Sequence, residues 1–102
     1  EATPVLGQTE NGAKTTLRSP RVQPEAIVYD AELLTSLPVA MSVTSGLNAM
    51  AHAVEALYAR DANPLSNALA MAGLQAFIRG LPTVVATPGD LSAREDTLFG
   101  AW

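Results

Sequence analysis

Three polar side chains in the middle of the chain have types and a spacing that could do chemistry. They are Asn48, His52 and Glu55, which stand at positions i, i+4 and i+7. Residues with this spacing lie on one side of a helix and come close together. His52 is the only histidine, so proton transfer or metal ligation by an imidazole can occur only there. On spacing alone, a structural or solvent-facing histidine is the commoner outcome, and the pattern leaves both readings open.

A helix that runs to residue 59 or 60 must position these side chains. Apolar residues recur at helical spacing on a second side of it, which predicts a face packed against a core. That face consists of Leu47, Met50, Ala51, Val54, Leu57 and Tyr58. Residues 39–43 predict the start of this helix, and Ser45-Gly46 is expected to interrupt or kink it.

The N-terminal part predicts a β-hairpin and a further strand. Residues 4–8 and 13–17 read as extended, and the Asn11-Gly12 pair in the turn between them favours positive φ. Residues 19–24 hold two prolines and predict a loop. Residues 26–29 are apolar and favour β structure, which predicts a short buried strand.

Helix boundary signals follow along the chain. Asp30 is expected to cap a brief helix over residues 31–36 that Pro38 ends. Asn63, with Pro64 after it, opens another helix, and we expect Gly80 and then Pro82 to stop that helix. The connector at 83–89 leads to a last helix, capped either by Asp90 or by a capping box at residues 92–95.

The composition is that of a folded protein. The chain is 48% hydrophobic and 16% charged, which is too apolar for intrinsic disorder. A net charge of -4 and only six basic residues oppose binding to nucleic acid, which requires clustered Lys and Arg. No apolar run approaches the ~20 residues that span a bilayer, so no membrane partner is expected. With no cysteine, disulfides and thiolate metal sites are excluded and the redox compartment cannot be inferred. A cytoplasmic protein is the default expectation.

The literal residues around His52 resemble those of a known family. Residues 44–58 read Thr-Ser-Gly-Leu-Asn-Ala-Met-Ala-His-Ala-Val-Glu-Ala-Leu-Tyr, and residues 61–64 read Asp-Ala-Asn-Pro. The run is similar to a helix of the maleylacetate reductases, which belong to the iron-containing (group III) alcohol dehydrogenase superfamily. The superfamily pattern there is Gly-x-Asp-Ala-x-x-His-Ala-x-Glu. Residues 19–24, 26–30 and 34–38 are also similar to family segments in the same order.

The resemblance covers essentially the whole chain and implies an α+β fragment of a longer protein. Family members are much longer, so we expect an internal part of a dehydroquinate synthase-like fold. Residues 1–37 would be the C-terminal part of the cofactor-binding domain, contributing a hairpin and a strand from its edge. Residues 38–102 would be the N-terminal part of the all-helical domain.

The resemblance also implies a site for NADH or NADPH. In the family a lysine after the hairpin turn binds the nicotinamide cofactor, and Lys14 matches it. Val5, on the opposing strand, matches the chain near the nicotinamide end, and Leu33 lies near the apolar contact with the adenosine part. From the residues alone, Lys14 reads as a solvated lysine on an edge strand and Leu33 reads as a core leucine.

The implied reaction is hydride transfer from NADH or NADPH to the carbon-carbon double bond of maleylacetate, which gives 3-oxoadipate in aromatic-compound degradation. His52 would donate a proton or hydrogen bond to the enolate oxygen that develops, with Asn48 donating beside it. Glu55 is expected to orient or pack rather than react.

A metal is not expected from this resemblance. Iron-dependent members of the superfamily use an aspartate and a histidine four apart on this helix and two later histidines. Here the aspartate position holds Asn48, a neutral amide, and the chain has no second histidine. This favours the reductase over a metal-dependent alcohol dehydrogenase, which stays open as an alternative. A third reading is a helical fragment without activity of its own.

The expected partners follow from the same resemblance. We expect a small-molecule substrate and a homo-oligomeric, dimeric parent protein. Helices cut from a larger domain leave apolar surface exposed, so the fragment alone is expected to self-associate.

Overall fold

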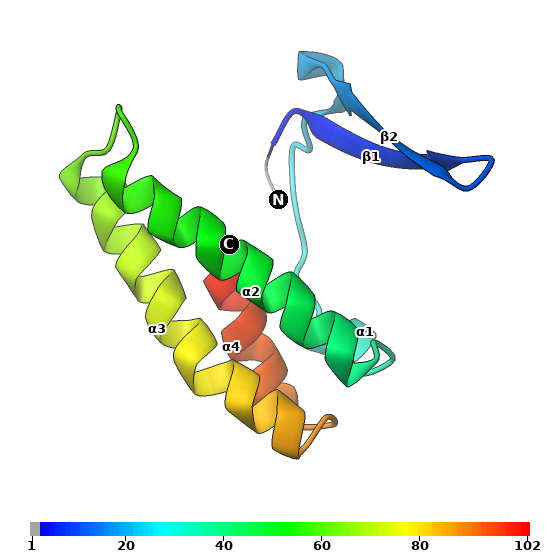
Figure 1. Ribbon diagram of the computed structural model, residues 1–102, viewed down its shortest axis with the longest axis vertical. Helices are drawn as coiled ribbons and strands as arrows, with labels where there is room; N and C mark the ends of the chain where they lie inside the picture. Colours follow the sequence, from blue (N-terminus) through cyan, green and yellow to red (C-terminus); the bar gives the residue numbers. More distant parts are fainter. Residues whose placement is uncertain (1–2) are drawn as a thin grey trace.

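A computed structural model describes residues 3–102, which form a hairpin followed by a group of helices. Figure 1 shows the hairpin to one side of the helices, with an extended segment joining the two parts. This arrangement confirms the predicted α+β class. The boundary at residue 38 between two domains stays a prediction. In chain order the elements are β1 (Val5–Glu10), β2 (Ala13–Arg18), the 3₁₀ turn η1 (Pro20–Val22), α1 (Ala31–Leu34), α2 (Val39–Tyr58), α3 (Pro64–Ala86) and α4 (Leu91–Ala101).

The hairpin is confirmed, with longer strands and a tighter turn than expected. β1 and β2 pair antiparallel from Val5 opposite Arg18 to Glu10 opposite Ala13. The turn is Asn11-Gly12 alone, with φ of 51° and 79°. Both residues tolerate positive φ, which a two-residue hairpin turn of this hand requires. Every residue of both strands is exposed.

The strand predicted at residues 26–29 is wrong for this structure. These residues are extended but belong to no regular element, and Val28 is 89% exposed. A strand needs a neighbour to accept and donate its backbone hydrogen bonds, and no segment within residues 3–102 pairs with this one. The loop before it contains one 3₁₀ turn, in which the Ser19 hydroxyl accepts a hydrogen bond from the Arg21 N–H.

The predicted helix caps are confirmed. The Asp30 carboxylate accepts a hydrogen bond from the N–H of Glu32 at 2.9 Å at the start of α1. Asn63 and Ser66 form a reciprocal capping box at the start of α3. α4 is capped by Asp90 and not by the competing serine, because the Asp90 carboxylate accepts from the third N–H of the helix at 2.9 Å.

The expected interruption of α2 at Ser45-Gly46 is wrong, because the helix is continuous from Val39 to Tyr58. Gly46 is buried for a packing reason. A Cβ there would lie 2.7 Å from the Leu81 side chain of α3. The glycine therefore lets α3 approach α2 and does not break the helix.

The expected end of α3 at Gly80 and Pro82 is also wrong, because the helix continues to Ala86. A Cβ at Gly80 would lie 2.7 Å from the carbonyl oxygen of Ala93, so this glycine allows α4 to approach closely. Pro82 removes one backbone donor, yet the helix continues past it, and its neighbours Leu81 and Val84 are packed against α2 and in the core. The connector consequently begins only at Thr87.

The packing face predicted for α2 is largely exposed. Leu47, Val54 and Tyr58 are 55%, 44% and 72% exposed. α2 instead turns its small residues inward, because Gly46 is buried and the alanines at 49, 53 and 56 are half-buried. The buried apolar core consists of Ala31, Ala70, Ala76, Phe77, Val84 and Ala93. Small side chains thus decide which helix faces meet. The large apolar residues of α2 predicted the wrong face of that helix as its packing face.

α3 is long and apolar enough to cross a membrane by length and composition, contrary to our expectation that no apolar run was sufficient. Its apolarity is spread over many alanines and leucines and interrupted by polar residues, so it does not read as one continuous run. The helix packs against both α2 and α4. A core helix of a globular domain meets the same criteria, so one such helix is weak support for a membrane span.

Replacing Gly80 with alanine is expected to lower the melting temperature. The added Cβ would press on the backbone oxygen of Ala93 at 2.7 Å, and such overpacking costs about 1–3 kcal/mol. The higher helix propensity of alanine offsets up to about 1 kcal/mol of that cost. Thermal melting followed by circular dichroism checks this. Gly89→Ala in the connector is the matched control, since nothing lies within 4 Å of its Cβ position. Equal melting temperatures for the two variants would contradict the packing argument.

Candidate functional site

The polar side of α2 holds the residues that the sequence singled out. The Nδ1 atom of His52 lies 3.7 Å from Oε2 of Glu55, and the two side chains are 70% and 64% exposed. Asn48 is exposed one turn earlier on the same helix. The predicted neighbourhood of histidine and glutamate is therefore confirmed, and the roles of Asn48 and His52 in chemistry stay predictions.

His52 stands at the edge of a groove of about 430 Å³ between α2, α3 and the end of α4. The floor is made of small residues, which leave room for a ligand. Among the described residues that line it, the polar side chains are His52 and Ser66, beside the indole of Trp102. The full lining is Ala49, His52, Ala53, Ala56, Ser66, Leu69, Ala70, Ala72, Gly73, Phe99, Gly100, Ala101 and Trp102. A mostly apolar hollow with few polar groups is the usual form of a small-molecule site.

The aromatic wall of the groove was missed by the sequence reasoning. The rings of Phe99 and Trp102 are 6.1 Å apart between centroids and tilted by 35°. Their exposed fractions are 50% and 70%. The available signal was two aromatic residues three apart beside Gly100, whose Cβ position lies 2.7 Å from Phe77. That glycine brings the end of α4 against α3.

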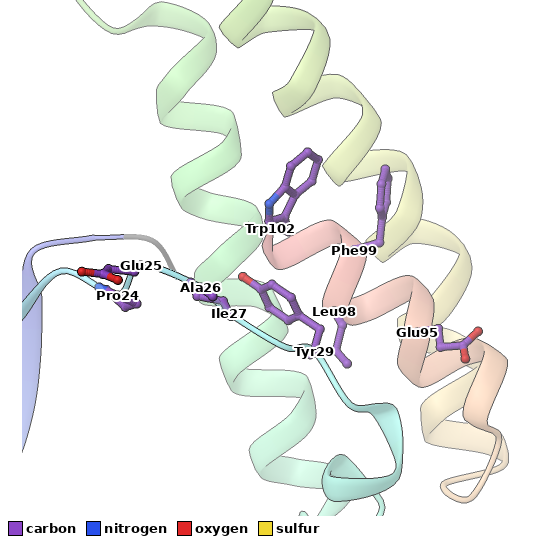
Figure 2. A pocket seen from close by; sticks show the side chains of 9 residues that line it. All are labelled: Pro24, Glu25, Ala26, Ile27, Tyr29, Glu95, Leu98, Phe99 and Trp102. Carbon is purple, nitrogen blue, oxygen red and sulfur yellow. The ribbon is translucent and has the colours of Figure 1, made fainter.

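A second hollow, of about 550 Å³, is lined in part by the same two aromatic residues (Figure 2). It is lined by residues 24–27 and Tyr29 of the extended segment, by Glu95, Leu98 and Phe99 of α4, and by Trp102. Figure 2 shows Tyr29 projecting from the segment toward the end of α4 that carries Trp102. This hollow contains no histidine, so the His52 groove is the better candidate for catalysis.

The hairpin brings two of the predicted cofactor residues onto one face. Residues directly opposite in an antiparallel pair share a face, and Lys14 opposite Thr9 and Val5 opposite Arg18 are on the same one. Gly7 lies between them without a side chain, and a Cβ there would lie 3.6 Å from Cε of Lys14. The lysine therefore leans across Gly7 in the direction of Val5.

The third predicted cofactor residue is elsewhere. Leu33 lies on α1 and is 73% exposed, so the reading of it as a core leucine is wrong. In Figure 1 the hairpin stands away from α1 and from the middle of α2. Residues 3–102 therefore do not by themselves assemble Lys14, Leu33 and His52 into one site. Contact of Lys14, Val5 and Leu33 with a cofactor stays a prediction.

The donor set on α2 does not fit a complete metal centre. Within residues 3–102 no three His, Cys, Asp or Glu side chains are placed to hold a metal ion. His52 and Glu55 would offer two ligands, and Asn48 contributes only a neutral amide. These side chains alone would leave a divalent cation short of protein ligands.

Comparison with known proteins supplies the family. A family model described as "Fe-containing alcohol dehydrogenase family, C-terminal" matches residues 42–102. The chain is 62% identical over its full length to "Maleylacetate reductase" of Rhizobium sp. strain MTP-10005 and 50% identical to that of Burkholderia cepacia. It spans 29% of the length of each of these curated relatives.

Solved structures agree with this result. The crystal structure of the Rhizobium maleylacetate reductase matches the whole chain with a TM-score of 0.86, and the chain covers 29% of it. The iron-containing alcohol dehydrogenase of Corynebacterium glutamicum matches 98% of the chain at 46% identity, with a TM-score of 0.83 and 28% of its own length covered. The present chain is therefore a member of the iron-containing alcohol dehydrogenase family.

Proposed function

We propose that this chain is one part of a longer, NAD(P)H-dependent maleylacetate reductase. The observation that carries the proposal is the 62% identity to a protein of that name over all 102 residues. The position of His52 on the edge of a small-molecule groove supports it. Such an enzyme reduces the carbon-carbon double bond of maleylacetate to give 3-oxoadipate, a step in aromatic-compound degradation.

The residues of α2 suit the charge that develops in this reaction. The bound nicotinamide supplies the hydride, and reduction of a double bond conjugated to a carbonyl places negative charge on the carbonyl oxygen. Because Nδ1 of His52 faces Glu55, Nε2 is the ring nitrogen available to a substrate. Donation from Nε2 with Nδ1–H toward Glu55 requires the imidazolium form, in which both ring nitrogens carry a hydrogen. A hydrogen bond from this Nε2–H to the enolate oxygen stabilises that charge, and the Asn48 amide can donate beside it. Proton transfer to the enolate then restores the ketone.

The test is reduction of maleylacetate by the full-length protein that carries this chain. We expect NADH or NADPH to be oxidised only when maleylacetate is present. The loss of absorbance of the reduced cofactor measures this oxidation. Parallel assays with each cofactor decide the preference between them. Absence of turnover with maleylacetate, together with oxidation of a primary alcohol by NAD⁺ or NADP⁺, would overturn the proposal.

The alternative activity is a metal-dependent alcohol dehydrogenase. The solved relatives from Corynebacterium glutamicum and Thermococcus thioreducens are both named iron-containing alcohol dehydrogenases, at 46% and 26% identity. The neutral Asn48 opposes this alternative, because it removes one anionic ligand from α2.

We further propose that the enzyme is cytoplasmic and dimeric. Size-exclusion chromatography with light scattering tests whether it is a dimer.

Chelation separates the two activities. Full-length protein stripped by a chelator is expected to keep most of its maleylacetate reduction, because Asn48 offers no carboxylate. Asn48→Asp is expected to create measurable affinity for a divalent metal if further ligands come from outside residues 3–102. Activity that disappears on chelation and returns with iron or zinc would restore the metal-dependent reading.

Lys14→Ala is expected to weaken cofactor binding by the full-length enzyme. A hydrogen bond to a charged group contributes about 1.5–3 kcal/mol, so the dissociation constant should rise about tenfold to hundredfold. Calorimetric titration with NADH and NADPH measures it. Thr15→Ala is the matched control, because Thr15 is on the opposite face of the same strand. Unchanged affinity in Lys14→Ala would refute the assignment.

A further inference from the structure

Arg94, in the first turn of α4, is a buried cation with unused hydrogen-bonding capacity. It is 1% exposed and is the one buried charged residue within residues 3–102. Its Nε donates to the carbonyl oxygen of Pro88 at 3.1 Å and its Nη1 donates to the Ser42 hydroxyl at 2.6 Å. Nη2 meets no acceptor in the described part of the chain. Both acceptors are neutral, so these contacts do not balance the charge of the guanidinium.

No carboxylate in residues 3–102 supplies the counter-charge. In this part of the chain Asp96 pairs with Arg79 and Glu55 lies near His52, and neither carboxylate pairs with Arg94. Asp90 is near in sequence, but its carboxylate caps α4 by accepting from the N–H of Ala93. The first turn of a helix is also the positive end of its dipole, which makes a cation less favourable there. A buried charge is strongly unfavourable unless a partner compensates it, so the arrangement calls for an anion.

A cavity of about 140 Å³ adjoins Arg94 where the four helices meet. Its polar lining consists of Arg94 and the hydroxyls of Ser42, Ser45 and Thr97, and the remaining lining is apolar. The volume is several times the ~30 Å³ that one water molecule occupies in the liquid. Nη2 is the buried atom of Arg94 that lacks an acceptor, and Arg94 is the one charged residue of the lining.

We propose that this cavity binds a single carboxylate group, with Arg94 as its cation. A guanidinium presents two parallel N–H groups that match the two oxygens of a carboxylate. The Ser45 hydroxyl is one turn of α2 from Ser42 and can donate to the same group. The carboxylate comes either from a free small molecule or from an aspartate or glutamate outside the present chain. The proposal does not depend on the reductase activity, because its test measures stability and occupancy.

The first experiment adds sodium formate to the full-length protein and follows thermal melting, with sodium chloride at equal ionic strength as the reference. A free carboxylate source predicts a saturable rise in melting temperature with formate that chloride does not produce. Arg94→Lys keeps the charge and loses the paired donors, so the midpoint for formate should rise about tenfold to hundredfold. Arg79→Lys is the matched control, because Arg79 is 58% exposed and paired with Asp96, and its response should equal that of the unsubstituted protein.

The second experiment is a crystal structure of the unsubstituted full-length protein with and without formate, which stays decisive if Arg94→Lys does not fold. Density for formate against Nη2 supports a free ligand. An aspartate or glutamate side chain against Nη2 supports the internal source, and its replacement by the amide should then create a formate response. Water alone in the cavity, with no formate response, would overturn the proposal, as would equal stabilisation by chloride.

Discussion

His52→Ala in the full-length enzyme is expected to lower kcat for maleylacetate reduction by about 10²–10⁴-fold, the usual contribution of a positioned acid or hydrogen-bond donor. His52 is the only imidazole in the chain and stands on the edge of the groove. Loss of a donor that acts mainly on developing charge lowers kcat more than it raises KM. Steady-state kinetics with the reduced cofactor at saturation measure both.

Two variants on the same helix make this result specific. Glu55→Gln removes the carboxylate that lies 3.7 Å from Nδ1 and is expected to lower kcat by less than His52→Ala, because we expect Glu55 to orient or pack rather than react. Tyr58→Phe is the control, since Tyr58 is 72% exposed and does not line the groove. A kcat for His52→Ala close to that of Tyr58→Phe would remove His52 from the mechanism.

Residues 1–102 produced alone are expected to self-associate or to remain molten. Their accessible surface is 7335 Å², whereas a folded monomer of this mass exposes about 5,500 Å². Even if only half of the difference is apolar, it corresponds to about 20 kcal/mol of missing burial. This exceeds the whole stability of an ordinary domain, about 5–15 kcal/mol. Light scattering at micromolar concentration measures the association.

The exposed face of α2 provides a directed version of this test. Leu47→Glu combined with Val54→Glu places two charges on that face, where both residues are about half exposed. We expect the double variant to associate less than the parent sequence. The same two charges at Thr9 and Thr16 on the hairpin serve as the control. A monodisperse monomer with a sharp cooperative melt for residues 1–102 would show that the exposed surface needs no further partner.

Local features of this fold were predictable because their hydrogen bonds close within a few residues. Asn11-Gly12 forms the hairpin turn because these two residue types tolerate positive φ. Asp30 and Asn63 cap their helices because a short polar side chain reaches the free N–H groups two or three residues later. The contact of His52 with Glu55 follows from helical spacing alone.

Features that depend on distant partners were decided by the tertiary structure. In sequence, α2 has one apolar side of large residues and another of glycine and alanine. Only the close approach of α3 at Gly46 determines that the side with the small residues is the buried one. Gly80 was predicted to end α3, but it instead allows α4 to approach closely. Glycine is suited both to helix ends and to close backbone contacts, and here the position of α4 determines its role.

The candidate site divides in the same way. By itself the sequence determined that His52 is the single imidazole, that Glu55 is its neighbour, and that the chain resembles the family to which it belongs. Only the tertiary structure placed Phe99 and Trp102 in the lining of the same groove as His52 and buried Arg94 next to a cavity whose lining has no carboxylate. Helical periodicity relates residues within one turn or two, whereas a groove and a buried charge are properties of where separate helices meet.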